Sequence, residues 1–187
     1  MRPQKVLDKK IVESLVDVFR SKGYDGASLS ELAEKTGLKK ASLYHRFPDG
    51  KQGMAIAVMD YLGERAEEKV FRALQNESVS PAKRLANGLN NIRDTYTGGK
   101  DACILRAFSL GSGLDLFGEQ IERGMIQWVE AFKSLGQALG LSDTLAQEYA
   151  IKSLLEIQGS LVVTKGLNDL NIFEKTLKDI EIRYMNK

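Results

Sequence analysis

The side chains with the clearest chemical potential lie between residues 28 and 51. They are cations, hydroxyls, a phenol and an imidazole, groups that form hydrogen bonds with phosphates and with the edges of nucleic-acid bases. The candidates are Ser28, Lys39, Lys40, Ser42, Tyr44, His45 and Lys51. Their clustering predicts a surface that binds double-stranded DNA.

Two short helices joined by a tight turn are expected to position these side chains. Ser28–Glu31 has the sequence of a capping box and predicts the start of the first helix. Gly37 predicts its end, because glycine readily adopts the positive φ that a tight turn needs. The second helix is expected over Lys39–Phe47, and Ala33 is small enough for the two helices to cross. Together they predict a helix-turn-helix, whose second helix enters the major groove.

The order of residues along the second helix suggests which group each one contacts. Lys39, Lys40 and Ser42 lead this helix, so we expect them to contact bases and phosphates. Either lysine could reach O6 and N7 of a guanine. Tyr44 and His45 are expected to contact phosphates.

Two candidates lie where other helices begin. Lys51 opens the helix that follows, where the helix dipole and unpaired N–H groups favour an anion. Ser28 could act in the same way at the first helix. Three alternatives stay open: Ser28 is only a cap, His45 is a solvated surface imidazole, or the two helices form a hairpin with a solvated lysine face.

Charge is unevenly distributed along the 187 residues. Residues 1–51 carry 11 Lys and Arg against 7 Asp and Glu, a balance of +4, while residues 52–187 carry 16 against 18, a balance of −2. A basic N-terminal segment suits a polyanionic partner. A chance imbalance of surface lysines is the alternative.

Composition excludes several classes of protein. One cysteine and one histidine leave no internal disulfide and too few ligands for a structural zinc site. The longest apolar run, Met54–Met59, is too short to cross a membrane, and we expect no signal peptide. Phosphate-binding loops, nucleophile elbows and helical metal motifs are absent from the sequence, so we expect no enzyme, catalytic residue, metal or cofactor. The expected location is the cytoplasm.

Helical periodicity continues through the rest of the chain. Apolar residues recur at steps of three and four, and sustained alternation typical of strands is absent from the sequence. Long helices are expected over 51–75, 114–139, 142–165 and 171–185. The sequence therefore predicts an all-α protein of about nine helices.

The segment Leu43–Pro48 and the lysine after it resemble the TetR family of bacterial transcriptional regulators. In that family a Leu-Tyr-x-x-Phe segment ends the recognition helix and a lysine opens the next helix. The spacing Phe47–Lys51 is one residue longer than in many members and resembles the LmrA/YxaF-type subgroup. The resemblance covers about residues 7–62.

The resemblance implies a DNA-binding head over residues 1–50 and a ligand-binding and dimerisation domain over residues 51–187. It implies a repressor that a small hydrophobic or aromatic effector releases from a palindromic operator. Two heads on two half-sites require a homodimer. The apolar stripes of the last two helices are expected to form it, or to close the core of the single chain. The six candidates are Leu154, Ile157, Leu161, Ile172, Phe173 and Leu177.

An effector pocket lined by the middle helices is also implied by the resemblance. Apolar walls with a few polar groups are typical of small-molecule sites. The candidates are Arg93, Tyr96, Phe108, Gln127, Trp128 and Glu156.

Two other functions remain as alternatives. Cys103 lies near an expected helix start, where a thiol can become reactive and sense electrophiles, although a buried small hydrophobe is the simpler interpretation. A helical adaptor that uses the head to bind proteins is the second alternative.

Overall fold

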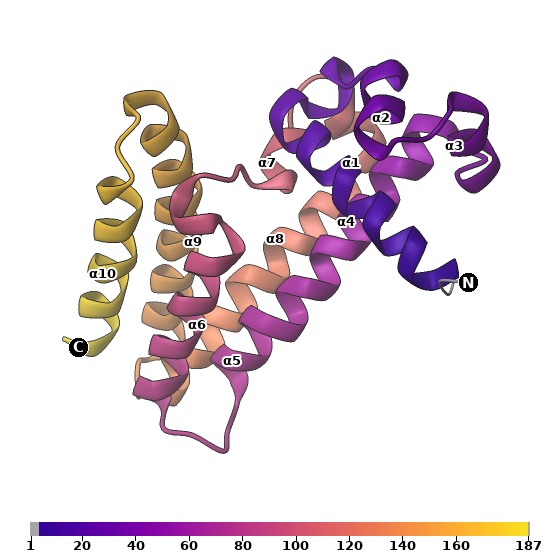
Figure 1. Ribbon diagram of the computed structural model, residues 1–187. Helices are drawn as coiled ribbons and strands as arrows, with labels where there is room; N and C mark the ends of the chain where they lie inside the picture. The colour runs from indigo at the N-terminus through magenta and orange to yellow at the C-terminus, as the bar shows by residue number, and fades with distance from the viewer. Residues whose placement is uncertain (1–3, 187) are drawn as a thin grey trace. The chain divides into compact units, whose positions relative to one another are not determined.

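The structure is a computed structural model that describes residues 4–186, and every regular element in that range is helical. The prediction of an all-α protein is confirmed. Figure 1 labels the helices in chain order. They are α1 (Gln4–Gly26), α2 (Leu29–Thr36), α3 (Lys40–Arg46), α4 (Gly50–Ala66), η1 (Glu67–Phe71), α5 (Arg72–Gln75), α6 (Pro81–Thr95), η2 (Thr97–Gly99), α7 (Ile104–Phe108), α8 (Ser112–Ala138), α9 (Asp143–Leu167) and α10 (Asn171–Met185).

The chain divides into two compact units. The first comprises the described residues up to Gly63 together with Ile104–Ile121, and the second comprises Glu64–Cys103 and the described residues from Glu122 onward. Helices α4 and α8 therefore contribute residues to both units. The boundary expected at residue 50, between a DNA-binding head and a ligand-binding and dimerisation domain, divides the chain by function and stays a prediction.

The first unit is built around the end of α1. Tyr24 lies among three buried rings, with ring centroids 6.5 Å from Phe19, 6.2 Å from Phe108 and 5.0 Å from Phe117. The carboxylate of the next residue, Asp25, accepts hydrogen bonds from the N–H, at 2.9 Å, and the hydroxyl of Ser112. These bonds hold the pKa of Asp25 below its usual range. The C-terminus of α1 is thereby joined to α7 and to the start of α8.

The second unit contains its own aromatic core. The ring centroid of Trp128 on α8 lies 5.3 Å from that of Phe71, 6.4 Å from that of Tyr96 and 6.4 Å from that of Phe132. Figure 1 shows α9 and α10 side by side, and Phe173 of α10 packs 6.2 Å from Tyr96. Residues far apart in the sequence thus meet in one apolar cluster.

Glycine at position 88 lets α6 pack closely against α5. A Cβ atom at Gly88 would overlap the side chain of Leu74, which is fully buried. A Cβ atom added at Gly63, in the exposed part of α4, would meet no atom within 4 Å. Both glycines have helical backbone angles, so only packing distinguishes them.

We expect Gly88→Ala to lower the free energy of unfolding by about 1–3 kcal/mol, the cost of overpacking a core. The control Gly63→Ala should raise it by roughly 0.5–1 kcal/mol, since alanine restricts the unfolded chain and favours a helix. Urea unfolding followed by circular dichroism measures both. Equal effects of the two substitutions would contradict the close approach of α5 and α6.

Candidate nucleic-acid interface

The start of α2 is a capping box, as the sequence predicts. The Ser28 hydroxyl accepts the N–H of Glu31 at 3.2 Å and donates to the Glu31 carboxylate at 2.9 Å. The N–H of Ser28 donates to the same carboxylate at 3.1 Å. These bonds from Ser28 lower the pKa of Glu31. The hydroxyl of Ser28 is therefore engaged at the helix start.

The turn between α2 and α3 requires a glycine. Gly37 has a φ of 68°, in the left-handed region, and its N–H donates to the carbonyl of Glu34 at 3.1 Å. The N–H of Leu38 donates to the carbonyl of Ala33 at 3.1 Å, which completes a Schellman motif. Leu32 and Leu43 are fully buried between the helices. The helix-turn-helix predicted from residues 28–47 is present.

Helix α3 turns its polar face to solvent. Lys39 is the N-cap residue, and Lys39, Lys40 and His45 are exposed. Tyr44 is 46% exposed, and Ser42 is half-buried. The structure thus brings five of the sequence candidates onto one short helix, with their donors accessible.

The Tyr44 ring rests on the first residue of α4. Gly50 has a φ of 60°, and a Cβ atom there would lie only 3.0 Å from Cε1 of Tyr44. Any larger residue at position 50 would be strained and would push the ring away. This contact gives a physical reason for the Pro-Asp-Gly spacing that precedes Lys51.

Lys51, which the sequence predicts to favour an anion at the start of its helix, lies against the end of α1 in the structure. Its ammonium donates to the carbonyl of Tyr24 at 3.0 Å and to that of Ala27 at 3.2 Å. It also lies 4.4 Å from the centroid of the Tyr24 ring, in cation–π geometry. In the structure the Lys51 ammonium, which comes from α4, supplies hydrogen-bond donors to backbone carbonyls at the end of α1. It does not point toward an external anion.

The six pocket candidates do not form one group. Tyr96 and Trp128 are buried together in the second unit, whereas Phe108 lies in the aromatic core of the first. Gln127 is exposed, although it precedes Trp128. Among the six candidates, Tyr96 and Trp128 are the pair whose rings are in direct contact.

The two charged pocket candidates are engaged in ion pairs. Arg93 donates through Nε to both carboxylate oxygens of Glu174, at 3.0 and 2.8 Å. Arg183 donates to both oxygens of Glu156, at 2.8 and 2.7 Å, and to Ser153 at 2.9 Å. Sequence reasoning missed Arg183 because its partners lie on another helix, 27 and 30 residues away.

Next to the Arg183 pair, burial raises the pKa of Tyr184 to about 12, so this phenol is neutral at physiological pH.

Most of the dimer candidates are packed inside the second unit. Leu154, Ile157, Leu161, Phe173 and Leu177 are buried, and Ile172 is half-buried. The five buried residues close the core of the single chain, which is the alternative to a dimer interface that the sequence leaves open. Other faces of α9 carry the exposed apolar residues. These are Ile151, Leu155, Val162, Val163 and Leu167.

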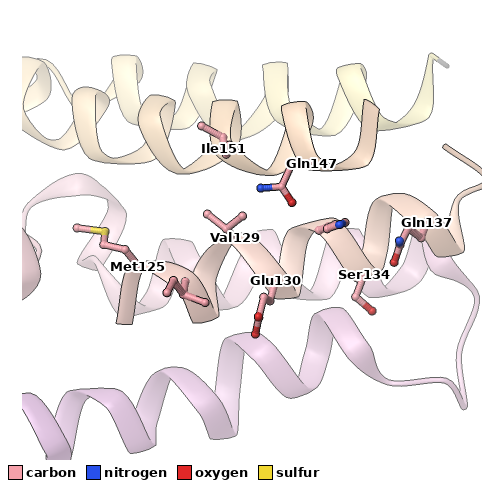
Figure 2. Close-up of a pocket in the computed structure, with 9 residues that line it drawn as sticks. Met125, Val129, Glu130, Ser134, Gln137, Gln147 and Ile151 are labelled. Carbon is pink, nitrogen blue, oxygen red and sulfur yellow. The ribbon is translucent and has the colours of Figure 1, made fainter. Parts of the chain in front are cut away.

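A shallow groove of about 600 Å³ lies between α8 and α9 within the second unit. Figure 2 shows Gln147 and Ile151 on α9 opposite Val129 on α8, with Met125 at one end and Gln137 toward the other. Ile151 also belongs to the exposed apolar set of α9, so the apolar surface of that helix continues into the groove.

Cys103 is a free thiol and is buried. Within residues 4–186 no His, Cys, Asp and Glu side chains gather in a group suited to a metal ion. In the same range no helix is both long and apolar enough to span a membrane.

Comparison with known proteins defines the class to which this site belongs. The sequence model described as "Bacterial regulatory proteins, tetR family" matches residues 11–58, which include the whole helix-turn-helix. The chain is 22% identical over 160 residues to the HTH-type transcriptional regulator LmrA of Bacillus subtilis, covering 83% of this chain and 85% of LmrA. It is 31% identical over 77 residues to YxaF of the same organism, covering 41% and 40%.

The fold agrees with that class. A TetR transcriptional regulator from Legionella pneumophila superposes with a TM-score of 0.80 at 18% identity, over 97% of each chain. The protein is a helix-turn-helix transcriptional regulator that binds DNA, and not an enzyme. Its helix-turn-helix is of the TetR family type.

The salt dependence of DNA binding should distinguish Lys40 from Lys51. The logarithm of the association constant falls linearly with the logarithm of the salt concentration. Replacing an exposed cation that contacts a phosphate makes this slope shallower by about 0.9 for each head. We expect this loss for Lys40→Gln. Lys51→Gln should weaken binding through displacement of α1 but leave the slope unchanged, because its ammonium is engaged inside the chain.

Fluorescence anisotropy with a labelled duplex of arbitrary sequence, titrated at several salt concentrations, measures both slopes. Equal losses of slope would mean that Lys51 turns outward and contacts DNA.

Proposed function

We propose that this chain is a ligand-responsive repressor that binds a palindromic operator as a homodimer. The single observation that carries the proposal is the exposed polar face of α3 in a helix-turn-helix of the TetR type. Repression and release by a small hydrophobic or aromatic effector come from the family resemblance. In this proposal residues 1–50 bind DNA and residues 51–187 bind the effector and dimerise, in the cytoplasm.

On DNA, α3 enters the major groove. Lys39, Lys40 and Ser42 contact bases and nearby phosphates, and Tyr44 and His45 contact phosphates. The contact of the Tyr44 ring with Gly50 supports this assignment, because it orients a partly exposed phenol before DNA arrives. Ser28 and Lys51 act by holding α2 and the end of α1 in position.

The dimer forms through α9 and α10 of each subunit, packed as a four-helix bundle. The exposed apolar residues of α9 support this surface, since a run of exposed leucine and valine side chains on one helix favours association. Gly159 and Gly166 have no atom within 4 Å of an added Cβ and leave room for a facing helix. The buried candidates, such as Leu154 and Ile157, support the surface from beneath.

The effector binds in the second unit beside Tyr96 and Trp128. Both are buried aromatic rings in an apolar cluster, the surroundings that suit a hydrophobic molecule. Binding favours a conformation in which the two heads no longer match the spacing of the half-sites, a shift of population with a reciprocal effect on affinity. The helical run Gly50–Gln75 carries the change.

Selection from a random library of duplex DNA at physiological salt tests the proposed function. Purified protein should enrich a palindrome, whose two half-sites are separated by about one helical turn or a multiple of it. A single asymmetric site would contradict the homodimer. A folded protein that enriches no sequence, even after unfolding and refolding to remove bound molecules, would favour the adaptor alternative.

A second prediction concerns the dimer surface. Leu155 on α9 is 66% exposed, and we expect Leu155→Glu to weaken dimerisation by about 3–5 kcal/mol, because a charge would be buried without a partner. Leu110, at 63% exposed, lies outside α9 and α10, so Leu110→Glu is the matched control and should leave the dimer intact. Sedimentation equilibrium measures both. Dissociation by Leu110→Glu alone would place the interface elsewhere.

A further inference from the structure

Gln158 on α9 ends in a buried amide that lacks a hydrogen-bond partner. Both its Nε2 and its Oε1 are buried, and neither forms a hydrogen bond within residues 4–186. A glutamine amide can donate two hydrogen bonds and accept two. Buried polar groups are nearly always hydrogen-bonded, because an unsatisfied donor or acceptor inside a protein lowers the stability of the fold. An amide that is unsatisfied at both atoms therefore needs a physical explanation.

The other polar residues of α9 and α10 are better satisfied. The Ser153 hydroxyl accepts a hydrogen bond from Arg183 at 2.9 Å, although this serine is fully buried. Within the described residues Thr164, Arg183 and Tyr184 each leave a single buried atom without a partner, whereas Gln158 leaves two. The fold of the single chain thus provides for its other buried polar groups more fully than for this amide.

The neighbours of Gln158 along α9 are apolar. Residues three and four positions apart on a helix share a face, and for Gln158 these are Leu154, Leu155, Leu161 and Val162. The first and third of these are buried, and the other two are exposed. The amide therefore stands at the edge of the buried face of α9, among apolar side chains. Apolar walls with a few polar groups that orient a ligand are typical of small-molecule sites.

The groove between α8 and α9 lies along the same side of α9. Ile151, which lines this groove of about 600 Å³, precedes Gln158 by two helical turns, so both residues point to one side of the helix. In Figure 2, α9 runs from Gln147 to Ile151 toward the end of the groove where Met125 lies, and Gln158 follows beyond that end. The groove offers an apolar molecule an approach to the amide.

We propose that Gln158 binds the effector through a pair of hydrogen bonds, and that the effector is a planar apolar molecule with a donor beside an acceptor. The inference rests on the proposed function and specifies its ligand. Gln158 lies in the second unit, as do Tyr96 and Trp128. A cyclic lactam, in which an N–H stands next to a C=O, is complementary to a primary amide. Its N–H donates to Oε1 of Gln158, and its C=O accepts from Nε2.

Burial of the amide before the ligand arrives strengthens this selection. An amide on the surface exchanges bonds with water for bonds with a ligand, so its net contribution to binding is small. The Gln158 amide is buried, so the two new bonds cost the protein no desolvation. A molecule of the same shape that lacks the donor leaves Oε1 unsatisfied, and the site therefore discriminates against it.

Two compounds of similar shape test the ligand class. 2-Quinolinone is a planar lactam, and 1-methyl-2-quinolinone lacks its N–H donor. Isothermal titration calorimetry of the wild-type protein should give 2-quinolinone a dissociation constant about tenfold lower or more, which corresponds to one hydrogen bond. Equal dissociation constants, or no binding of either compound, would overturn the proposal.

Two methionine variants show whether the Gln158 amide is the cause of this preference. Methionine has a similar length and a similar helix propensity but carries no amide. The preference for 2-quinolinone should be lost in Gln158→Met. It should persist in Gln147→Met, the matched control, because that residue lines the groove on the same helix but its amide is not among the buried unsatisfied groups. A preference that survives in Gln158→Met would overturn the proposal.

Thermal unfolding without ligand supplies a test that needs neither compound nor DNA. Removal of an unsatisfied buried amide should raise the Tm of Gln158→Met by about 2–4 °C or more. Gln147→Met should leave the Tm close to the wild-type value. An amide that held a buried water molecule would stabilise the fold, so a lower Tm in Gln158→Met would contradict the proposal.

Release from DNA separates this inference from the proposed function. 2-Quinolinone should release the wild-type protein from the selected operator and leave the complex of Gln158→Met intact. If the wild-type protein enriches no operator, the proposed function fails, while the calorimetric preference holds or fails independently. If the protein binds both the operator and 2-quinolinone but is not released, the assignment of Gln158 to the effector site is overturned.

Discussion

The backbone carbonyls at the end of α1 need hydrogen-bond donors, and the DNA-binding head depends on the lysine that supplies them. Lys51 reaches from α4 to the carbonyls of Tyr24 and Ala27 and places its charge against the Tyr24 ring. The same ring packs against Phe108 and Phe117, and the neighbouring Asp25 accepts from Ser112. One cation and one ring thus connect α1, α4, α7 and α8. The position of α3 follows from this connection, because Ser28, the N-cap residue of α2, directly follows Ala27.

The second unit stabilises itself in a different way. Its charged side chains pair with one another, as in Arg93 with Glu174 and Arg183 with Glu156, and its aromatic rings form a continuous cluster around Trp128. Pairing satisfies these charges inside the chain, while α9 exposes apolar residues such as Leu155 and Val162.

Local structure could be predicted from the sequence because its causes lie within one or two helical turns. The capping box of Ser28 and Glu31 and the left-handed Gly37 depend on neighbours no more than four residues away, and the structure contains both. The same holds for the periodicity that predicted an all-α chain. Burial of Leu43 leaves Lys40 and Tyr44 exposed on the other side of α3, as helical periodicity requires, and their contact with DNA stays a prediction.

The sequence by itself determined the all-helical class, the helix-turn-helix and the type of ligand that α3 can contact. Tertiary structure alone decided the role of Lys51, whose acceptors lie 24 and 27 residues away, and the pairing of Arg183 with Glu156. It also decided that Leu154 is buried while Leu155 is exposed, and that the helix after Ala66 widens into a π-turn. These four features, namely the Lys51 contacts, the Arg183 pair, the covered face of α9 and the π-turn, share one physical reason. Helical periodicity shows which residues share a face, but the packing of other helices decides which face is covered and where the backbone must yield.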